Sequence, residues 1–489
     1  MTASRWGHSP KEFPALAMLL LVPPITFATL WAAADRPSSL SALAVASLPL
    51  VLAVVVFFPA VSVGCLAGLI MANAGLVLQA EGVPNVVRLA TLLAAAGLFA
   101  RYAARERMLG WTPVLLAFAV FAVVRILSAF VAPDGADTYD AAKILVFGAL
   151  IIIVVTGVTS GIDVLRGIAA AIVATASVLV ILSALKLNGI GDTFGGFAAD
   201  VVLGPERLDD ALRSLQPPTD DGRVSGPLGD PNFWAQSLLV ALPLALWLAR
   251  DARSRAGRLA AVAATGVIGV GIISTQSRGG LIALFVGVSA FVWLVGGRAR
   301  LLLAVLPIVV AGVLATSDAG SRFEQLRDLA QPREAVDPSI RGRLSEDLAA
   351  VEMFSDHPLI GLGAGQYTPH YAQYATRIGL DERREREPHN SYLEMAAESG
   401  VLGLAAFLGL LGTMIVTTFR SRARLVRNGE LAAGHLAEAL IAAMLGYGIA
   451  AVFLHQAFPE YLWLLLGLAA GVWTLSARGA HGAPYRGAT

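Results

Sequence analysis

The 489-residue chain has few charged residues and only one cysteine, Cys65. Charged residues make up 15% of the sequence and hydrophobic residues 56%, whereas soluble domains carry roughly 25% charged residues. This deficit excludes an ordinary soluble protein. A single cysteine also excludes an intrachain disulfide framework and any cysteine-rich metal site. Because Cys65 lies in an apolar run, we expect it to be a small buried hydrophobe.

A strong net charge and a metal-binding motif are missing as well. The formal net charge is +1, so no global field favours nucleic acid, and no nucleic-acid partner is expected. The seven histidines are scattered along the chain, and none forms H-E-x-x-H or another metal spacing. We therefore expect neither a bound metal nor a cofactor.

Long apolar windows are abundant instead. They lie near residues 14–34, 40–58, 60–79, 85–101, 111–131, 143–159, 162–185, 233–250, 256–274, 279–296, 299–316, 391–419, 433–455 and 459–476. Since a transmembrane helix needs about 20 mostly apolar residues, the windows predict about fourteen spans. The sequence therefore predicts an all-α polytopic membrane protein, with residues 1–489 as a single integral membrane domain.

The distribution of arginine predicts the orientation of these spans. With the N-terminus placed in the cytoplasm, the inside segments hold Arg101, Arg105, Arg107, Arg250, Arg253, Arg255, Arg258, Arg298, Arg300, Arg420, Arg422, Arg424, Arg427, Arg478 and Arg486. The short outside loops hold Asp35, Glu81, Asp134, Asp137, Asp140 and Glu460. Because cytoplasmic loops are enriched in Lys and Arg, this asymmetry predicts that both termini are cytoplasmic.

The polar segments then fall on the outer side. They are the loop 186–232, the turn TQSRGG at 275–280 and the long loop 317–390. Within the long loop, apolar residues at helical spacing predict an amphipathic helix over 342–355 that lies against the membrane domain. These residues are Leu344, Leu348, Val351 and Phe354. Any chemistry is expected on this outer face.

Three arginines near the outer boundary are candidates for binding phosphate. Arg278 lies between two predicted spans, where it either snorkels to lipid headgroups or binds a ligand. Arg343 precedes the loop helix, and Arg223 lies close to the predicted span that starts at 233. The neighbouring Arg341 is not a candidate, because we expect it to be solvated. Guanidinium binds phosphate through two parallel hydrogen bonds and stays charged. Arginines without paired acidic ligands predict a phosphate held without a cation.

His389 is the candidate base, because it follows Pro388 and precedes a predicted helix on the outer face. Ser391 and Glu394 have the spacing of a capping box, which favours a structural role for Glu394. Glu398 falls on the same helix face as Glu394. One charge is left without explanation: Arg125 lies inside a predicted span.

Four segments together resemble the O-antigen ligase and polymerase superfamily. HNSYLEMAAESGVLG at 389–403 is similar to its H-N-x9-G-x2-G signature. The other three are DPNFWAQSLLVALPL at 230–244, TQSRGG at 275–280, and Arg343, Ala350, Pro358 and Gly361 in the pattern R-x6-A-x7-P-x2-G. The resemblance covers about 225–415. Family members often have Trp four residues after the loop arginine, where this chain has Asp347.

This resemblance implies a membrane glycosyltransferase of the GT-C type in the bacterial inner membrane, with a periplasmic active site. It implies that a glycan passes from an undecaprenyl-diphosphate-linked donor to an acceptor hydroxyl, without a metal. His389 is implied as the catalytic residue, and Arg278 and Arg343 as diphosphate-binding residues. The resemblance implies four further roles more weakly. Arg223 would bind the donor, and Asn232, Asn390 and Glu398 would support the site.

Several functions remain open at this stage. An O-antigen ligase uses lipid A core as its acceptor, whereas a polymerase of O-antigen or exopolysaccharide uses a growing glycan, and a protein oligosaccharyltransferase uses a protein side chain. These three share the motifs. A transporter or flippase of lipid-linked glycan belongs to another class and predicts charged or broken helices near the membrane midplane. A scaffold role for the long loop is the remaining alternative.

Overall fold

The computed structural model describes most of the chain as helices. It covers residues 58–76, 85–104, 110–132, 135–187, 223–303, 338–378, 387–454 and 459–480, and these contain no strand. The helices of the first half are α3 (Pro59–Met71), α5 (Val86–Ala104), α6 (Pro113–Ala129), α7 (Gly135–Val158) and α8 (Ile162–Leu187). Those of the second half are η2 (Gly226–Leu228), α10 (Pro231–Arg250), α11 (Arg255–Ser274), α12 (Arg278–Val295), η3 (Gly297–Leu301), α15 (Pro338–Asp356), α16 (Tyr367–Arg377), α17 (Ser391–Arg427), α18 (Leu431–Ala450), η6 (Ala451–Phe453) and α19 (Glu460–Ala480).

Nine helices in the described part of the chain are long and apolar enough to cross a membrane, and α3 and α6 are shorter apolar helices. All of them coincide with predicted windows, which confirms an all-α polytopic membrane protein. The predicted window 14–34 and most of 40–58 and 299–316 lie outside the described residues. So do most of the loop 186–232 and, within the long loop 317–390, residues 317–337 and 379–386.

The helices begin where the sequence offers caps. The Asp230 side chain accepts hydrogen bonds from the backbone N–H groups of Asn232 and Phe233, and Pro231 occupies the first helical position of α10. The Ser277 side chain accepts from Gly280 N at the start of α12. Such caps satisfy N–H groups that have no partner within the helix. They fix the helix ends that carry Asn232 and Arg278.

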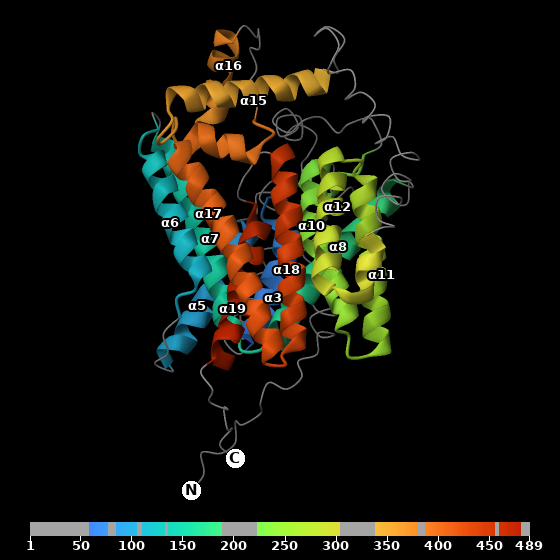
Figure 1. Cartoon of the computed structure of the whole chain (residues 1–489). Coiled ribbons are helices and arrows are strands. Elements are labelled where there is room, and N and C mark those ends of the chain that lie inside the picture. The colour runs from blue at the N-terminus through green and yellow to red at the C-terminus, as the bar shows by residue number, and fades with distance from the viewer. Residues whose placement is uncertain are drawn as a thin grey trace, which may run out of the picture.

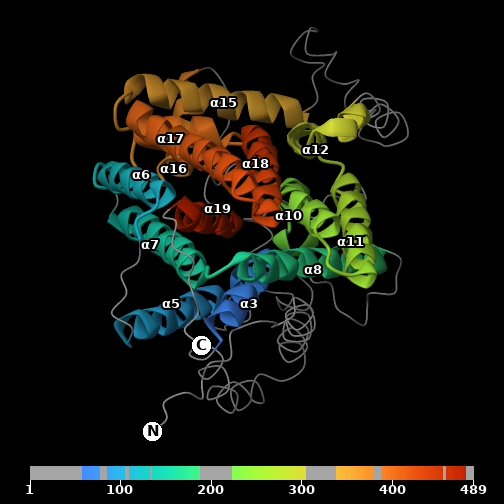
Figure 2. The ribbon, with the colours of Figure 1, turned by 60° about the horizontal axis from the view of Figure 1, so that its bottom comes forward.

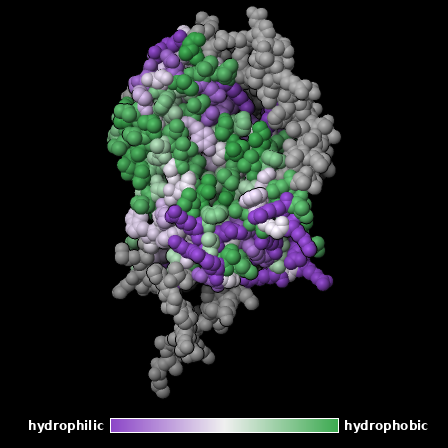
Figure 3. All heavy atoms as spheres, viewed as in Figure 1, coloured by the Kyte–Doolittle hydropathy of each residue, from purple (hydrophilic) through white to green (hydrophobic). Residues whose placement is uncertain are grey.

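The bundle has a central helix and an apolar belt. Figure 2 shows α19 in the middle of the helices, where it packs on α7, α17 and α18. Large side chains fill this core, among them Trp234, Trp247 and Trp463. In Figure 3 hydrophobic residues form a band between two polar ends of the described surface. This band is consistent with a lipid-facing belt.

One end of the bundle is covered by a separate layer, which we call the cap. It consists of α15, α16 and residues 387–399, and α15 lies across this end in Figure 1. The helix predicted over 342–355 is confirmed as α15. However, its buried face is the one with Ala349 and Met353, which packs on the tyrosines of α16. The predicted leucines Leu344 and Leu348 are exposed. Small residues allow α15 to lie close to the aromatic rings, so they form the packed face instead.

The opposite end of the bundle is held by arginine ion pairs. Arg250 and Arg422 both contact the buried carboxylate of Glu438, at 2.6 and 2.7 Å. Arg253 pairs with Asp163. The end predicted to be basic is therefore the end away from the cap.

A kink divides α17, the helix that contains the predicted window 391–419, into two parts. Gly400 has φ 65°, so the helix is interrupted there. A Cβ at Gly400 would collide with the backbone of Leu359, and one at Gly361 would collide with the backbone of Glu398. Only glycine tolerates both the positive φ and this close crossing. Residues 391–399 therefore belong to the cap, and 401–427 form the span.

Candidate functional site

His389 lies in the cap beside a buried carboxylate that no sequence motif singles out. Its Nδ1 is 2.6 Å from Oε2 of Glu346 on α15, and the Glu346 side chain is only 3% exposed. A neutral imidazole that donates Nδ1–H to Glu346 carries its lone pair on Nε2. The pair therefore favours the tautomer in which Nε2 can accept a proton.

Arg343 and Asp347 lie one helical turn apart on α15, next to Glu346. Burial and the negative charge of Glu346 raise the pKa of Asp347 to about 6, and the positive charges of His389 and Arg343 act in the opposite direction. Arg343 and His389 therefore both lie within electrostatic reach of Asp347. Asp347, which stands where the family often has Trp, is thus part of a charged cluster.

Arg223 and Asn232 lie together at the capped end of the bundle. Arg223 donates from Nε to the carbonyl oxygen of Thr275 at 3.0 Å and from Nη2 to Oδ1 of Asn232 at 3.2 Å. The Ser277 hydroxyl donates to the same Oδ1 at 2.8 Å. Asn232 thus joins Arg223 to the turn that immediately precedes Arg278.

A short segment after α18 links the start of α12 to the start of α17. A Cβ at Gly279 would lie 2.6 Å from the Phe453 ring. The Ser391 hydroxyl donates to the carbonyl oxygen of Leu454 at 2.6 Å. Arg278 precedes Gly279, and His389 is two residues before Ser391, so both lie beside the same segment. The structure brings Arg223, Arg278, Arg343, Asn232 and His389 to one end of the molecule.

Asn390 has a structural task, which corrects the predicted capping box. Its side-chain oxygen accepts from the N–H groups of Tyr392 and Leu393, at 3.1 and 3.3 Å, and so caps α17. Ser391, the predicted cap, instead contacts Leu454. The Asn390 side chain therefore fixes the backbone next to His389.

Glu398 pairs with Arg125, the charge that the sequence left unexplained. The two side chains are 2.5 Å apart and only 6% and 8% exposed. Glu398 also accepts from the Tyr367 N–H, at 3.2 Å, through its other oxygen. Ser128 on α6 donates to the Glu398 carbonyl oxygen at 2.6 Å. Together these contacts hold α6 against the part of α17 that ends at the Gly400 kink.

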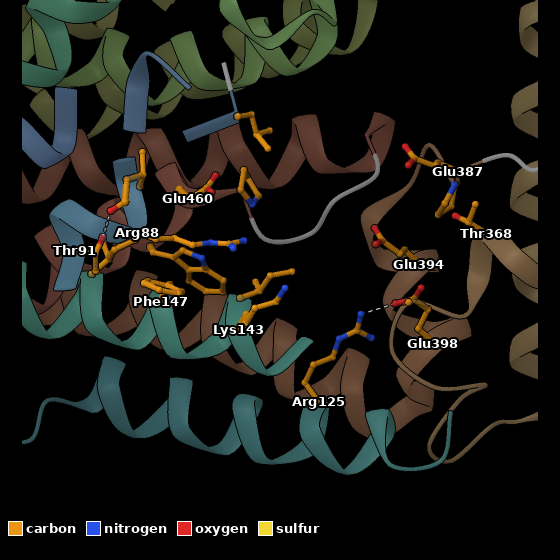
Figure 4. Close-up of a pocket in the computed structure, with 18 residues that line it drawn as sticks. Arg88, Thr91, Arg125, Lys143, Phe147, Thr368, Glu387, Glu394, Glu398 and Glu460 are labelled. Atoms are coloured by element: carbon orange, nitrogen blue, oxygen red, sulfur yellow. Dashed lines mark hydrogen bonds and ion pairs between the residues drawn. The ribbon is translucent and has the colours of Figure 1, made fainter. Parts of the chain in front are cut away.

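A cavity of about 390 Å³ lies between the cap and helices α5, α6, α7, α17 and α19. Figure 4 shows Glu387, Glu394 and Glu398 at one part of its wall and Arg88 and Lys143 at another. Sequence analysis did not select Arg88 and Lys143, because each lies in an otherwise apolar window. Such a basic residue in a predicted span is nevertheless a signal of function.

The remaining question for the site is metal binding. Within the ranges that the structure describes, no three His, Cys, Asp or Glu side chains are grouped so that they could hold a metal ion. What the arrangement does offer is a base, His389, with a buried carboxylate behind it, and arginines from α12, α15 and the segment before α10. This combination suits proton abstraction next to a departing anionic group.

Residues 260–408 match the model of the O-antigen ligase family. The match begins in α11 and ends in α17, so it includes Arg278, Arg343, His389 and Glu398. The chain matches no curated protein.

Proposed function

We propose that the chain belongs to the O-antigen ligase and polymerase superfamily, because the model of the O-antigen ligase family matches residues 260–408, and that it is a GT-C-type glycosyltransferase. It transfers a glycan from an undecaprenyl-diphosphate-linked donor to an acceptor hydroxyl, and we favour O-antigen ligase, with lipid A core as the acceptor. The observation that carries this proposal is the His389–Glu346 pair at the same end of the bundle as Arg223 and Arg278.

The mechanism follows from these residues. His389 Nε2 takes the proton from the acceptor hydroxyl as its oxygen attacks the anomeric carbon of the donor sugar. The bond from that carbon to the diphosphate breaks, and the lipid diphosphate leaves. Glu346 stabilises the imidazolium that forms, much as a buried aspartate does in a catalytic triad. Arg278 and Arg343 stabilise the charge on the leaving diphosphate.

Because arginines supply the positive charge in this mechanism, we propose that transfer needs no divalent metal. Activity should persist in excess EDTA. Loss of activity that magnesium or manganese restores would contradict an arginine-only site.

We place the protein in the bacterial inner membrane with the cap in the periplasm. The arginine-rich end, where Arg250, Arg253 and Arg422 lie, then faces the cytoplasm, as the positive-inside rule requires. A cysteine introduced at Gln373, an exposed position of α16, should react with a membrane-impermeant thiol reagent in intact spheroplasts of a Cys65→Ser strain. Labelling only after permeabilisation would reverse the orientation.

Two other functions are supported by particular observations. Polymerisation of O-antigen or exopolysaccharide uses the same residues, because the superfamily includes both activities. Transport of lipid-linked glycan is the candidate from another class, since Arg88 and Lys143 lie on predicted spans and line a cavity.

Transfer in detergent separates these classes, because a transporter has no membrane to work across there. Purified protein is mixed with a lipid-linked glycan donor and lipid A core, and the product is followed by gel mobility. We expect the wild type to form a glycan–core product. His389→Ala should reduce the rate by about 10²–10⁴-fold, the usual value of general-base assistance. No transfer by the wild type to any lipid-linked acceptor would overturn the proposal.

A further inference from the structure

The cavity beside the cap has no part in the mechanism described so far. Its outer part is bounded by Glu387 and Pro388, the residues directly before His389. Its other walls come from α5, α7 and α19, through residues such as Arg88, Lys143 and Trp463. The cavity thus runs from the segment that carries the base into the membrane bundle (Figure 4).

Arg88 is the most informative residue of this cavity. Its guanidinium lies over the Phe147 ring, 5.6 Å from the ring centre. Its backbone N–H is bonded to Asn85, whereas its guanidinium has no hydrogen bond or ion pair with any residue that the structure describes. A guanidinium within a membrane span is costly unless an anion or water stabilises it. A cation held this way in a cavity wall is suited to receive an anionic ligand.

Lys143 adds a second positive charge to the same cavity from α7. Its ammonium group lies 4.5 Å from the centre of the Tyr139 ring. Figure 4 shows Arg88 and Lys143 near each other and away from Glu387 and Glu394. One part of the wall therefore carries Arg88 and Lys143 together with Glu460, and the part next to the cap carries Glu387, Glu394 and the Arg125–Glu398 pair.

The rest of the lining suits a sugar. Carboxylates such as Glu387 and Glu394 accept hydrogen bonds from hydroxyl groups. Trp463 and Phe147 add aromatic side chains to the lining, and Phe147 lies beside Arg88. Ligand pockets of this kind combine apolar and aromatic walls with a few polar groups, and typically have volumes of about 300–1,000 Å³.

We propose that this cavity binds the acceptor of the transfer reaction, a lipid-linked saccharide with a phosphate or other anionic group. The anionic group lies on Arg88 and Lys143, and the sugar extends toward Pro388 so that its hydroxyl reaches His389. The arginines at 223 and 278 then serve the donor. The inference rests on the proposed function. Lipid A core and a growing chain on a lipid diphosphate share this chemistry, so the test must separate them.

The first test measures binding without catalysis. Purified full-length wild type, Arg88→Gln and the control Arg258→Gln are compared by native mass spectrometry in detergent. Arg258 is exposed on α11, outside the cavity. The probes are lipid A core, its dephosphorylated form, an undecaprenyl-diphosphate trisaccharide and phosphatidylglycerol.

We expect Arg88→Gln to weaken binding of one phosphorylated saccharide by roughly tenfold or more, the usual effect of losing a charge-assisted hydrogen bond. Arg258→Gln should bind as the wild type does, and the dephosphorylated form should be insensitive to Arg88. If Arg88→Gln weakens binding of lipid A core, the cavity binds the acceptor of a ligase. If it weakens binding of the undecaprenyl-diphosphate trisaccharide, the cavity binds the acceptor of a polymerase. Unchanged binding of both saccharides, or an equal loss for phosphatidylglycerol, would overturn the proposal.

The second test uses turnover. Arg88→Gln should raise the acceptor KM by roughly tenfold and leave kcat and the donor KM near their wild-type values, and Arg88→Lys should recover part of the loss. A fall in kcat at saturating acceptor with an unchanged acceptor KM would show a structural role instead. A wild type that binds glycolipid through Arg88 but never transfers glycan would overturn the proposed function while supporting the binding site.

Discussion

His389 and Glu346 are 43 residues apart in the chain, yet Nδ1 of the imidazole lies 2.6 Å from the Glu346 carboxylate. The carboxylate is almost fully buried, and it comes from a helix that also carries Arg343. One helix of the cap thus supplies both the residue that orients the base and an arginine for the diphosphate.

Glu346→Gln should impair transfer although the amide fills the same space. It removes the negative charge that stabilises the imidazolium, and its amide nitrogen can hold His389 in the wrong tautomer. We expect kcat to fall by about 10²-fold or more, in line with the loss of the carboxylate from a triad, with little change in either KM. The matched control is Glu352→Gln on the same helix, whose carboxylate contacts Arg377 at 3.7 Å. Equal activities of the two variants would remove Glu346 from the mechanism.

Arg278→Lys and Arg343→Lys should each be impaired, because lysine keeps the charge but loses the planar fork that binds a diphosphate. We expect kcat/KM for the donor to fall by roughly tenfold or more for each. The measurement is initial rate against donor concentration at saturating acceptor. The control is Arg300→Lys in η3, which follows the opposite end of α12. Wild-type rates in both variants would reduce the two arginines to general electrostatics.

The Arg125–Glu398 pair predicts an ordered series of stabilities. Arg125→Met leaves the Glu398 charge buried and unpaired, so it should destabilise the fold by about 3–5 kcal/mol. Replacing both residues by Met removes the stranded charge, so the double variant should melt well above the single one. Melting temperatures in detergent test this order. A double variant no more stable than Arg125→Met would show that the hydrogen bonds to Ser399 and Tyr367, and not the charge pair, hold the kink.

Asp347 predicts how stability depends on pH. Its pKa is raised by burial to about 6, so the folded protein holds this proton more tightly than the unfolded chain does. Stability from this group is therefore present at acidic pH and is lost as pH rises through about 6. Asp347→Asn stays neutral, so it should gain stability relative to the wild type between pH 4.5 and 8. Parallel melting curves for the two proteins across this range would contradict the burial of Asp347.

The sequence predicted the helical spans because apolar windows of membrane length are a strong signal. The windows match α5, α6, α8 and α10 to α12 within a few residues, whereas α7 begins at Gly135 and its window at 143. His389, Arg278 and Arg343 were selected because they lie in motifs of a known superfamily, and their roles stay predictions. Neither signal depends on knowing the fold.

What the sequence could not predict are contacts between distant segments. Glu346 lies in a helix with several acidic residues, and nothing local distinguishes the one that faces His389. Arg125 and Glu398 are 273 residues apart, so only the fold explains the charge within a span. The leucine face of α15 was expected to pack, but the smaller residues on another face fit against the tyrosines of α16.

Gly400 also determines how the two halves of the site can move. His389, Glu346 and Arg343 all belong to the cap, whereas Arg223 and Arg278 belong to the bundle. A rotation of the cap about the glycine crossing would leave the base and its carboxylate together while it changed their separation from Arg278. Because Arg125 on α6 is paired with Glu398 beside this crossing, the pair anchors the cap to the bundle next to the glycine.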